Sequence, residues 1–366
     1  MIRDLSQAQR RDWLRLARTE NVGPVTFEEL IARFGEPALA LAALPDLARR
    51  GGRASGLKIP TQGEAEREIE AGTALGARLI ANCEPPFPQA LAALDPPPPL
   101  LWARGDVAML DRPSVAVVGA RVASAAGQRF ARGLATELGQ AGQIVVSGMA
   151  RGIDASAHEG ALPHGTVAVL GGGIDDVYPP EHHSLYARIV AAGCVVSENE
   201  PGRTAVARDF PRRNRIIAGL SRAVVVVEAE LRSGSLITAR LALEQGREVL
   251  AVPGSPLDPR ARGANDLIRQ GAAICEGVED VLRALEGLRG FREPEAPPYR
   301  TLQAESDPAL TRRLAELLSP TPVSRDELVR AAAAPAPAVF AALTELALAG
   351  RAELLAGGMV VTGSSL

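Results

Sequence analysis

The middle of the chain alternates short apolar runs with longer amphipathic stretches. Runs of valine, isoleucine and alanine without interior polar positions predict strands that are covered on both faces. Their regular alternation with amphipathic stretches predicts an α/β fold with a Rossmann-like, doubly wound parallel sheet. The predicted strands are 114–118, 144–146, 166–170, 194–197, 223–228 and 249–252, and the predicted helices are 125–141, 154–162, 182–192, 214–220 and 235–245.

The first 85 residues show helical rather than strand-like spacing. Ser6 is the predicted cap of a helix through Leu16, and residues 21–26 predict a Gly-Pro turn into a second helix that ends at Gly35. Helix, tight turn and helix form the outline of a helix-hairpin-helix, in which turn amides can hold a DNA phosphate. A helical packing module without DNA contact is an equally good interpretation. Residues 64–81 predict a further helix with a short strand, 77–81, at its end.

Proline-rich stretches divide the chain. The run Asp-Pro-Pro-Pro-Pro at 95–99 excludes helix and central strand and leads into residues 100–103, a predicted edge strand. After the sheet, three helices (309–318, 325–332 and 335–348) and a glycine-turned hairpin (352–355 with 359–362) predict a winged helix. The predicted domains are a helical domain (1–85), a Rossmann-like domain (86–288), a linker (289–306) and a winged helix (307–366).

The third helix of this tail is alanine-rich and has no basic face. A winged helix usually binds DNA through such a helix. Contact with another protein surface, or a regulatory role, is therefore at least as good an interpretation for this tail.

Composition narrows the class of protein and its surroundings. In 366 residues, 46% hydrophobic and 23% charged positions are ordinary for a globular protein, and the N-terminus does not resemble a signal peptide. No apolar run approaches the roughly 20 residues of a membrane span. Three widely spaced cysteines without a CxxC pair favour a reducing cytoplasm. A net charge of −3 means that any site for a polyanion is a local patch.

Glycine, hydroxyl and arginine residues follow four of the predicted strands. In a parallel sheet these loops meet at the carboxyl edge, where ligands bind. Arg121 and Ser124 can donate to a phosphate, and residues 233–235 leave backbone N–H groups at the start of a helix, where an anion is stabilised. The four loops, at 119–124, 147–154, 171–175 and 232–235, therefore predict an anionic ligand.

A cluster of arginines beside a phenylalanine sharpens this prediction. Residues 210–215 read Phe-Pro-Arg-Arg-Asn-Arg, which combines a flat stacking surface with positive charge. A phosphate joined to a base is the ligand that suits both. Lys58 is the only lysine, so a single arginine carries little weight here and the clustering carries more.

Several enzyme classes lack their signatures. The chain contains no Walker A loop and no complete dinucleotide fingerprint, so we predict no nucleotide cofactor. His182 and His183 are adjacent and would point to different faces of a helix, which disfavours a metal site. Asp154 is better explained as a helix cap than as a catalytic acid. Glu198, Glu200 and Glu228 lack a nucleophile or histidine partner, so we predict no enzymatic activity.

Seven motifs occur in the order in which they occur in one known family. The chain resembles the DNA-processing protein A family (DprA, also called Smf) throughout, most specifically over 114–276. The helical start is similar to the family's sterile-alpha-motif-like domain, and the tail is similar to its winged helix. The motifs are 117–121 (VVGAR), 147–155 (SGMARGIDA), 178–179 (YP), 210–221 (FPRRNRIIAGLS), 232–239 (RSGSLITA), 252–255 (VPGS) and 263–265 (GAN).

The resemblance implies a cytoplasmic, non-enzymatic protein that binds single-stranded DNA in natural transformation and DNA recombination. It implies protection of incoming strands, loading of the RecA recombinase, single-strand binding protein as a further partner, and a homodimer. Phe210 would stack on a base. The phosphate pocket implied by the resemblance comprises Gly119, Arg121, Ser147, Gly148, Arg212, Asn214, Arg215, Ser233, Gly234 and Ser235, and the loops and arginine cluster add Ser124, Arg151, Arg213 and Thr238.

The chain departs from the family pattern at four places. Many relatives have a lysine where Pro180 stands and an asparagine where His182 stands, so the resemblance implies that part of the positive pocket is lost here or supplied by another arginine. Relatives often have a tyrosine at Asn199 and a cysteine at Ala264. Two other functions stay open: a nucleotide-binding enzyme of the phosphoribohydrolase type, although its Pro-Gly-Gly-x-Gly-Thr signature is absent, and a DNA-binding regulator that acts through the winged helix.

Overall fold

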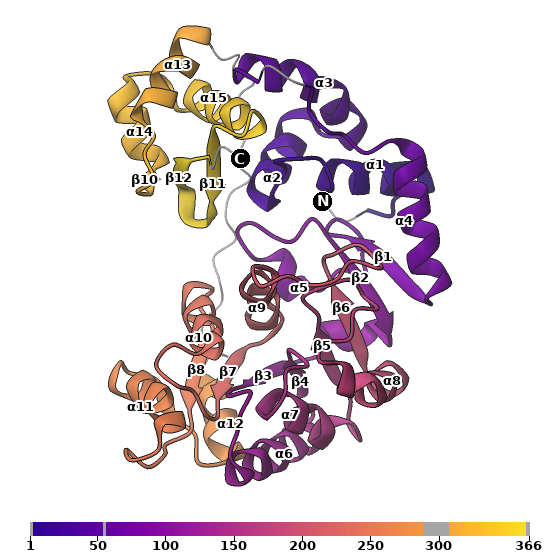
Figure 1. The fold of residues 1–366 in the computed structure, drawn as a ribbon, viewed down its shortest axis with the longest axis vertical. Helices are drawn as coiled ribbons and strands as arrows, with labels where there is room; N and C mark the ends of the chain where they lie inside the picture. Colours follow the sequence, from indigo (N-terminus) through magenta and orange to yellow (C-terminus); the bar gives the residue numbers. More distant parts are fainter. Residues whose placement is uncertain (1–2, 54–55, 288–306, 364–366) are drawn as a thin grey trace. The chain divides into compact units, whose positions relative to one another are not determined.

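The structure, a computed structural model, describes residues 3–53, 56–287 and 307–363. They form two compact units (Figure 1). Of the described residues, one unit contains 3–53, 56–69, 95–100 and 307–363, from both ends of the chain, and the other contains 70–94 and 101–287. The predicted linker, 289–306, lies outside the described residues.

The larger unit is organised around a nine-stranded sheet in the order β1-β2-β6-β5-β4-β3-β7-β8-β9. All six registered pairs from β6 through β9 are parallel, and β2 is antiparallel to β6. This confirms the predicted α/β class. The strands are β1 (Ala77–Ala81), β2 (Leu100–Gly105), β3 (Ser114–Val118), β4 (Ile144–Ser147), β5 (Thr166–Val169), β6 (Cys194–Ser197), β7 (Ala223–Val226), β8 (Glu248–Ala251) and β9 (Ala273–Ile274).

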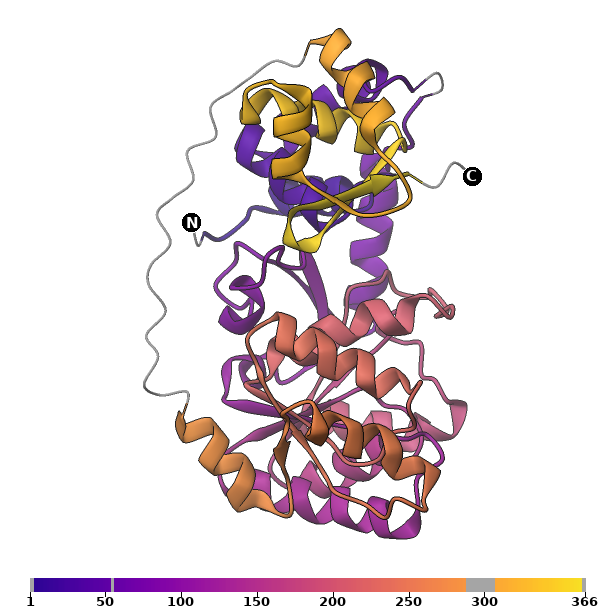
Figure 2. The ribbon, with the colours of Figure 1, turned by 90° about the vertical axis from the view of Figure 1, so that its left-hand side faces the viewer.

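Helices cover both faces of this sheet (Figure 2). Along β3, Val115 and Val117 pack on one face while Ala116 and Val118 pack on the other, as period-2 geometry requires. The face of Val115 is covered by α6 (Ala125–Gln140), α7 (Ile153–Ala161) and α12 (Val278–Gly287), and the face of Ala116 by α9 (Asp209–Leu220), α10 (Gly234–Glu244) and α11 (Arg262–Arg269). The shorter α5 (Gln89–Ala92) packs on α9, and α8 (His183–Ala192) on β5 and β6.

The chain leaves β3 on one side toward β4 and returns on the other side at β7. The carboxyl ends of β3 and β7 therefore flank the topological switch point, where open α/β sheets bind their ligands.

Two sequence predictions are wrong in detail. The segment 100–103 was expected at an edge, but β2 is an interior strand between β1 and β6, and its apolar residues are buried. Helix α9 begins at Asp209 rather than at Asn214. Pro211 is compatible with a first helical turn, and the Asp209 carboxylate accepts a hydrogen bond from the Val206 N–H and so fixes the chain entering the helix.

The other unit contains a helical module and a winged helix. Ser6 caps the first helix in a capping box with Gln9, as predicted, and the second helix ends at Gly35, whose φ is 75°. The helices of the module are α1 (Gln7–Ala17), α2 (Pro24–Phe34), α3 (Pro37–Arg50) and α4 (Gln62–Ala74), of which α4 runs on into the other unit. The winged helix consists of α13 (Pro308–Leu317), α14 (Arg325–Ala332), α15 (Ala336–Leu348) and a sheet of β10 (Val323–Ser324), β12 (Met359–Thr362) and β11 (Ala352–Leu355).

Among the described residues no single helix is long and apolar enough to cross a membrane. Only α14 and α15 taken together, across a bend of 111°, meet the criteria of length and composition.

Candidate functional site

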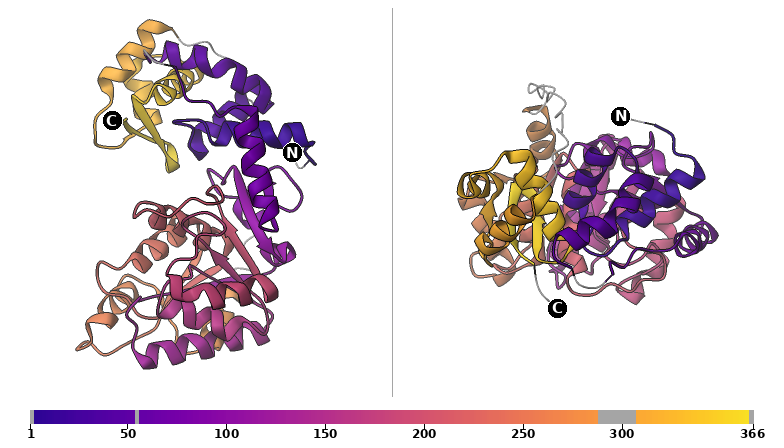
Figure 3. Two further views of the ribbon diagram at one scale, coloured as in Figure 1. Left: turned by 45° about the vertical axis from the view of Figure 1, so that its right-hand side comes forward. Right: turned by 90° about the horizontal axis from the view of Figure 1, so that it is seen from above.

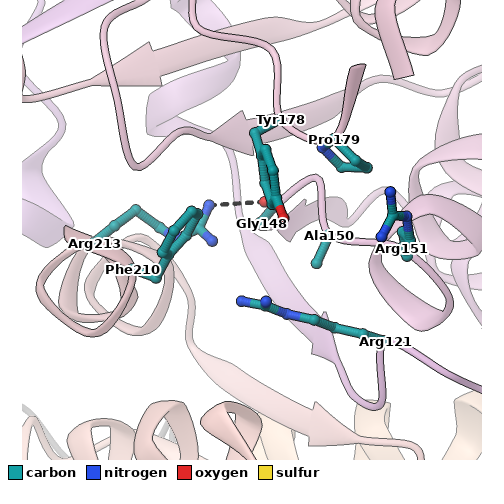
Figure 4. Close-up of a pocket in the computed structure, with 8 residues that line it drawn as sticks. All are labelled: Arg121, Gly148, Ala150, Arg151, Tyr178, Pro179, Phe210 and Arg213. Atoms are coloured by element: carbon teal, nitrogen blue, oxygen red, sulfur yellow. Dashed lines mark hydrogen bonds between the residues drawn. The ribbon is translucent and has the colours of Figure 1, made fainter. Parts of the chain in front are cut away.

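Three of the strand-end loops meet the first turns of α9 in a small open pocket (Figure 4). The loops after β3 and β4 reach the pocket through residues of the predicted ranges 119–124 and 147–154. The segment after β5 reaches it at Tyr178 and Pro179, beyond the predicted range 171–175, and the predicted range 232–235 is not part of the lining. Arginines and aromatic rings dominate the lining, which consists of Arg121, Gly148, Ala150, Arg151, Tyr178, Pro179, Phe210 and Arg213.

Helical spacing brings Phe210 and Arg213 to the pocket together, because residues three apart lie on one face of a helix. The Phe210 ring is 5.8 Å from the Tyr178 ring, centroid to centroid, with 52° between the planes. The guanidinium carbon of Arg121 lies 5.5 Å from the Phe210 centroid. Tyr178 is 49% exposed, so its ring remains available to a further planar group.

Arg213 is the fixed cation of the site. It is buried, and it donates hydrogen bonds to the carbonyl oxygens of Gly148, at 2.8 Å, and Val169. Burial lowers the pKa of Arg213 to about 10, which still leaves it charged at neutral pH. A side chain on Gly148 would come within 2.8 Å of the Arg213 guanidinium, so the loop after β4 requires glycine at this position.

Asp154 holds the same loop from the other side. Its carboxylate accepts hydrogen bonds from the N–H groups of Gly148 at 3.1 Å and Ala150 at 3.3 Å. It therefore reaches back to the loop, while the N-cap position of its own helix is Gly152, which has no side-chain cap. Burial raises the pKa of Asp154, and Arg213 and the two amides oppose that rise.

The two exposed arginines differ in their partners. Arg151 pairs with Glu181, and this ion pair lowers the pKa of Glu181 to about 2. Arg121 makes no ion pair within the described residues and contacts the Phe210 ring instead. Arg121 is therefore the cation of the pocket that is most readily available to a phosphate.

The start of α6, at the switch point, is occupied by the chain's own carboxylate. Glu228 accepts hydrogen bonds from the Ser124 N–H at 2.9 Å and the Ser124 hydroxyl at 2.6 Å. A side chain on Gly127 would meet this carboxylate at 2.6 Å. The donors expected from Ser124 are thus already engaged, and a negative charge already sits at the helix N-terminus where an anionic ligand would bind.

Most other predicted site residues support the loops and lie outside the pocket lining. Gly119 allows Ile153 to approach, since a side chain there would come within 2.6 Å of it. The fully buried Ser147 hydroxyl donates to the Val117 carbonyl at 2.7 Å. Arg215 forms an ion pair with Glu198, and the Asn214 amide donates to the Gly234 carbonyl at 3.2 Å, so Asn214 joins α9 to the start of α10.

At the start of α10 the predicted residues bond to one another. The hydroxyls of Ser233 and Ser235 are 2.7 Å apart, and Ser233 caps the helix. Thr238 is buried one turn later. Arg212 is exposed on α9 but is not part of the pocket lining.

Tyr178, Pro179 and Ala150 line the pocket but were not among the predicted site residues. Tyr178 and Pro179 form one of the seven motifs and stand five and six residues beyond Gly173, the last of three consecutive glycines. An aromatic residue so close to a strand-end glycine loop is the signal that could have identified them.

Glu181 and His182 hold neighbouring segments of the chain together. Glu181 forms an ion pair with Arg151, and the His182 ring is hydrogen-bonded to the Met149 carbonyl at 2.9 Å. Among the described residues no cluster of metal-binding side chains occurs.

The chain matches one family over all of its parts. The profile described as DNA recombination-mediator protein A matches residues 78–286, the DprA-like N-terminal HHH domain matches 7–71, and the DprA winged helix domain matches 294–358. Protein Smf of Escherichia coli is 41% identical over 283 residues, which is 75% of this chain and 74% of that protein.

Two solved structures are similar as well. The X-ray structure of DNA processing protein A from Streptococcus pneumoniae aligns with a TM-score of 0.62 at 33% identity, covering 74% of this chain and 95% of that one. DNA processing protein A from Helicobacter pylori, whose single-stranded DNA binding mode has been described, aligns with a TM-score of 0.53 at 30% identity, covering 59% and 97%. The chain belongs to the DprA/Smf family of DNA recombination-mediator proteins.

Proposed function

We propose that this chain binds single-stranded DNA, without catalysis, at the pocket between the β3, β4 and β5 loops and α9. The observation that carries this proposal is the group of two adjacent rings, Tyr178 and Phe210, beside the guanidinium of Arg121, which forms no ion pair in the part of the chain that the structure describes. Rings stack on bases of any sequence, and guanidinium groups bind phosphates. The binding mode described for the Helicobacter pylori relative supports the same ligand here.

A single strand suits the pocket better than a duplex does. The stacking surface is the exposed Tyr178 ring, which a base can reach only when it is not stacked and paired within a helix. The buried Arg213 and Asp154 keep the loop after β4 rigid, so little ordering is needed when the strand binds.

A nucleotide-dependent enzyme is less well supported. The site where such a fold holds a phosphate, the start of α6, contains the Glu228 carboxylate. Of the other two candidate acids, Glu198 is paired with Arg215, and Glu200 is exposed and outside the pocket lining. The Glu228 and Glu198 carboxylates are engaged in holding the fold, so we propose a binding protein.

We propose further that the bound strand is protected and passed to the RecA recombinase during natural transformation, with single-strand binding protein as another partner, and that the chain acts in the cytoplasm as a homodimer. Membership of the family supports these proposals. Assembly of RecA on strands coated with single-strand binding protein, with and without this chain, tests the transfer step. Arg121→Ala serves as the variant that should lose the effect.

Binding itself is tested with a fluorescent oligo-dT and a matching duplex across a salt series. We expect selective binding of the single strand, with affinity that falls as salt rises. Arg121→Ala should weaken binding and flatten the salt slope by roughly one phosphate contact. Arg188, exposed on α8 and outside the pocket lining, provides the matched control Arg188→Ala.

Arg215→Ala provides an intermediate case. Because Arg215 already forms an ion pair with Glu198, its loss should weaken oligo-dT binding less than the loss of Arg121 does. A clear preference for the duplex, or full affinity in Arg121→Ala, would contradict the proposal. Deleting residues 300–366 separates it from a winged-helix regulator, because the pocket lies entirely in the larger unit and single-strand binding should survive.

A further inference from the structure

The third helix of the winged helix, α15, has no exposed residue: all thirteen are buried or partly buried. In DNA-binding relatives of the helix-turn-helix class this helix enters the major groove, and its outer face is polar and open. Here the sequence Ala-Pro-Ala-Val-Phe-Ala-Ala-Leu-Thr-Glu-Leu-Ala-Leu is apolar except at Thr344 and Glu345, and both of these residues are buried. A helix of this kind requires cover on every side.

The inner face of α15 is covered by its own domain. Val339, Leu343 and Leu346 pack with Leu310 and Leu314 of α13 and with α14 in one core. The remaining cover comes from the other end of the chain, because α15 also packs against α2 and α3 of the N-terminal module, within the same compact unit (Figure 3).

A carboxylate of the N-terminal module contacts polar groups of the tail. Glu29, on α2, accepts a hydrogen bond from the Thr344 hydroxyl at 2.5 Å and lies 2.6 Å from the guanidinium of Arg325. Arg325 in turn stands 5.5 Å from the centroid of the Phe340 ring. These two partners of the partly buried Glu29 come from α14 and α15, more than 290 residues away along the chain.

At the end of α3, Gly51 lies in close contact with the backbone of α15. A side chain on Gly51 would lie 1.9 Å from the backbone oxygen of Glu345, so only glycine lets the two helices approach this closely. The backbone of Gly51 is ordinary, with φ −68° and ψ −5°, so its conformation does not itself call for glycine. Nearby, the Asn21 amide donates to the Leu348 carbonyl at 3.3 Å.

From these contacts we infer that α15 is a permanent docking element whose partner is the α2–α3 face of the same chain, so that the winged helix binds protein with the helix that its relatives offer to duplex DNA. The apolar sequence of α15, the Glu29 cluster and the close approach at Gly51 are independent features that agree on this partner. The inference does not depend on the pocket in the sheet, and either can fail without the other.

Hydrogen exchange on the full chain tests the docking. Gly51→Leu places a wedge against Glu345 while leaving every tail residue unchanged. We expect exchange to rise about tenfold or more in two separate segments, α2–α3 and α15, while the sheet keeps its protection. The control is Gly133→Leu, because Gly133 lies in α6 with open space where its side chain would go. If Gly51→Leu raises hydrogen exchange in α3 alone, while α15 exchanges as slowly as in the wild type, the inference is overturned.

A double-mutant cycle tests the contact without a steric change. Glu29→Met and Thr344→Val each remove one partner of the hydrogen bond, and we expect the combined variant to lose less stability than the sum of the two. Additive effects in this cycle would contradict a direct contact. Crosslinking of α15 residues to duplex DNA in the wild-type chain would contradict the docking as well, because the docked helix has no exposed residue.

Discussion

Two segments at the carboxyl edge of the sheet contain similar residues, but one is occupied by a carboxylate of the chain itself and the other borders an open pocket. Both the start of α6 and the loop after β4 combine glycine, serine and arginine, and both were predicted to hold a phosphate. At the start of α6 the Glu228 carboxylate takes the donors of Ser124. At the other place Asp154 and Arg213 are buried beneath the loop, and Arg121 and the Tyr178 ring remain open above it.

The difference shows how one sheet edge is restricted to one ligand site. A helix N-terminus attracts an anion whether it belongs to a ligand or to the chain. A glutamate two residues beyond the end of β7 fills the first place, so the conventional nucleotide position is closed. The second place offers positive charge and aromatic surface together, a combination suited to a flexible polynucleotide rather than to a compact cofactor.

The largest effect on stability and binding should come from replacing Arg213, the buried arginine that holds the loop after β4. Arg213→Met removes two hydrogen bonds to backbone carbonyls and the positive charge that favours the ionised form of Asp154. We therefore expect a loss of about 3 kcal/mol in the free energy of unfolding and of most single-strand affinity. Denaturant titration and oligo-dT binding measure the two. The neighbouring exposed Arg212→Met should leave stability unchanged, and equal effects of the two variants would argue against a special role for Arg213.

Removal of the exposed ring should have the next largest effect. Tyr178→Ala should weaken oligo-dT binding by about 1–2 kcal/mol, the size of one lost stacking contact, while Tyr178→Phe should bind like the wild type. Fluorescence anisotropy measures both variants. Weakened binding in Tyr178→Phe as well would mean that the hydroxyl rather than the ring contacts the strand.

Glu228→Gln tests the closed place. It replaces a charged acceptor of the Ser124 donors with a neutral one, so we expect a loss of roughly 1 kcal/mol in stability. Single-strand affinity should stay within error, because Glu228 is not part of the pocket lining. A marked change in oligo-dT binding would show that the two places act as one site and would break the comparison.

The smallest effect concerns Arg151, which is held by Glu181. Glu181→Gln frees this guanidinium and removes a negative charge beside the pocket, so affinity should rise roughly threefold at low salt and less at high salt. The pKa of Glu181 is lowered to about 2 in the folded chain, so this carboxylate stays charged well below the ordinary range for glutamate. The ratio of variant to wild-type affinity should therefore be constant from pH 7.5 to pH 5, and a ratio that narrows on acidification would contradict this assignment.

The sheet could be predicted because its strands are continuous apolar runs, which can be recognised without knowing which strands pair with one another. The sequence misplaced β2, since position in a sheet is a matter of tertiary pairing and β1 covers the side that was expected to be free. In the site, Phe210 and Arg213 were predicted from their clustering, but the occupation of the α6 start was not, because Glu228 follows Ser124 by 104 residues. Nor could the sequence show that Arg215 is paired with Glu198, whereas Arg121 has no ion-pair partner among the residues that the structure describes.

The central claim, that the open place is where the strand binds, is tested most directly by photocrosslinking. An oligo-dT that carries one 5-iodouracil is bound to the full-length protein, irradiated and digested, and the modified residue is identified by mass spectrometry. Our account predicts attachment at Tyr178 or Phe210, lost on competition with unlabelled oligo-dT and in Arg121→Ala. Attachment at the start of α6, in the helices α1–α2 or in the winged helix, with the pocket unmodified, would contradict it.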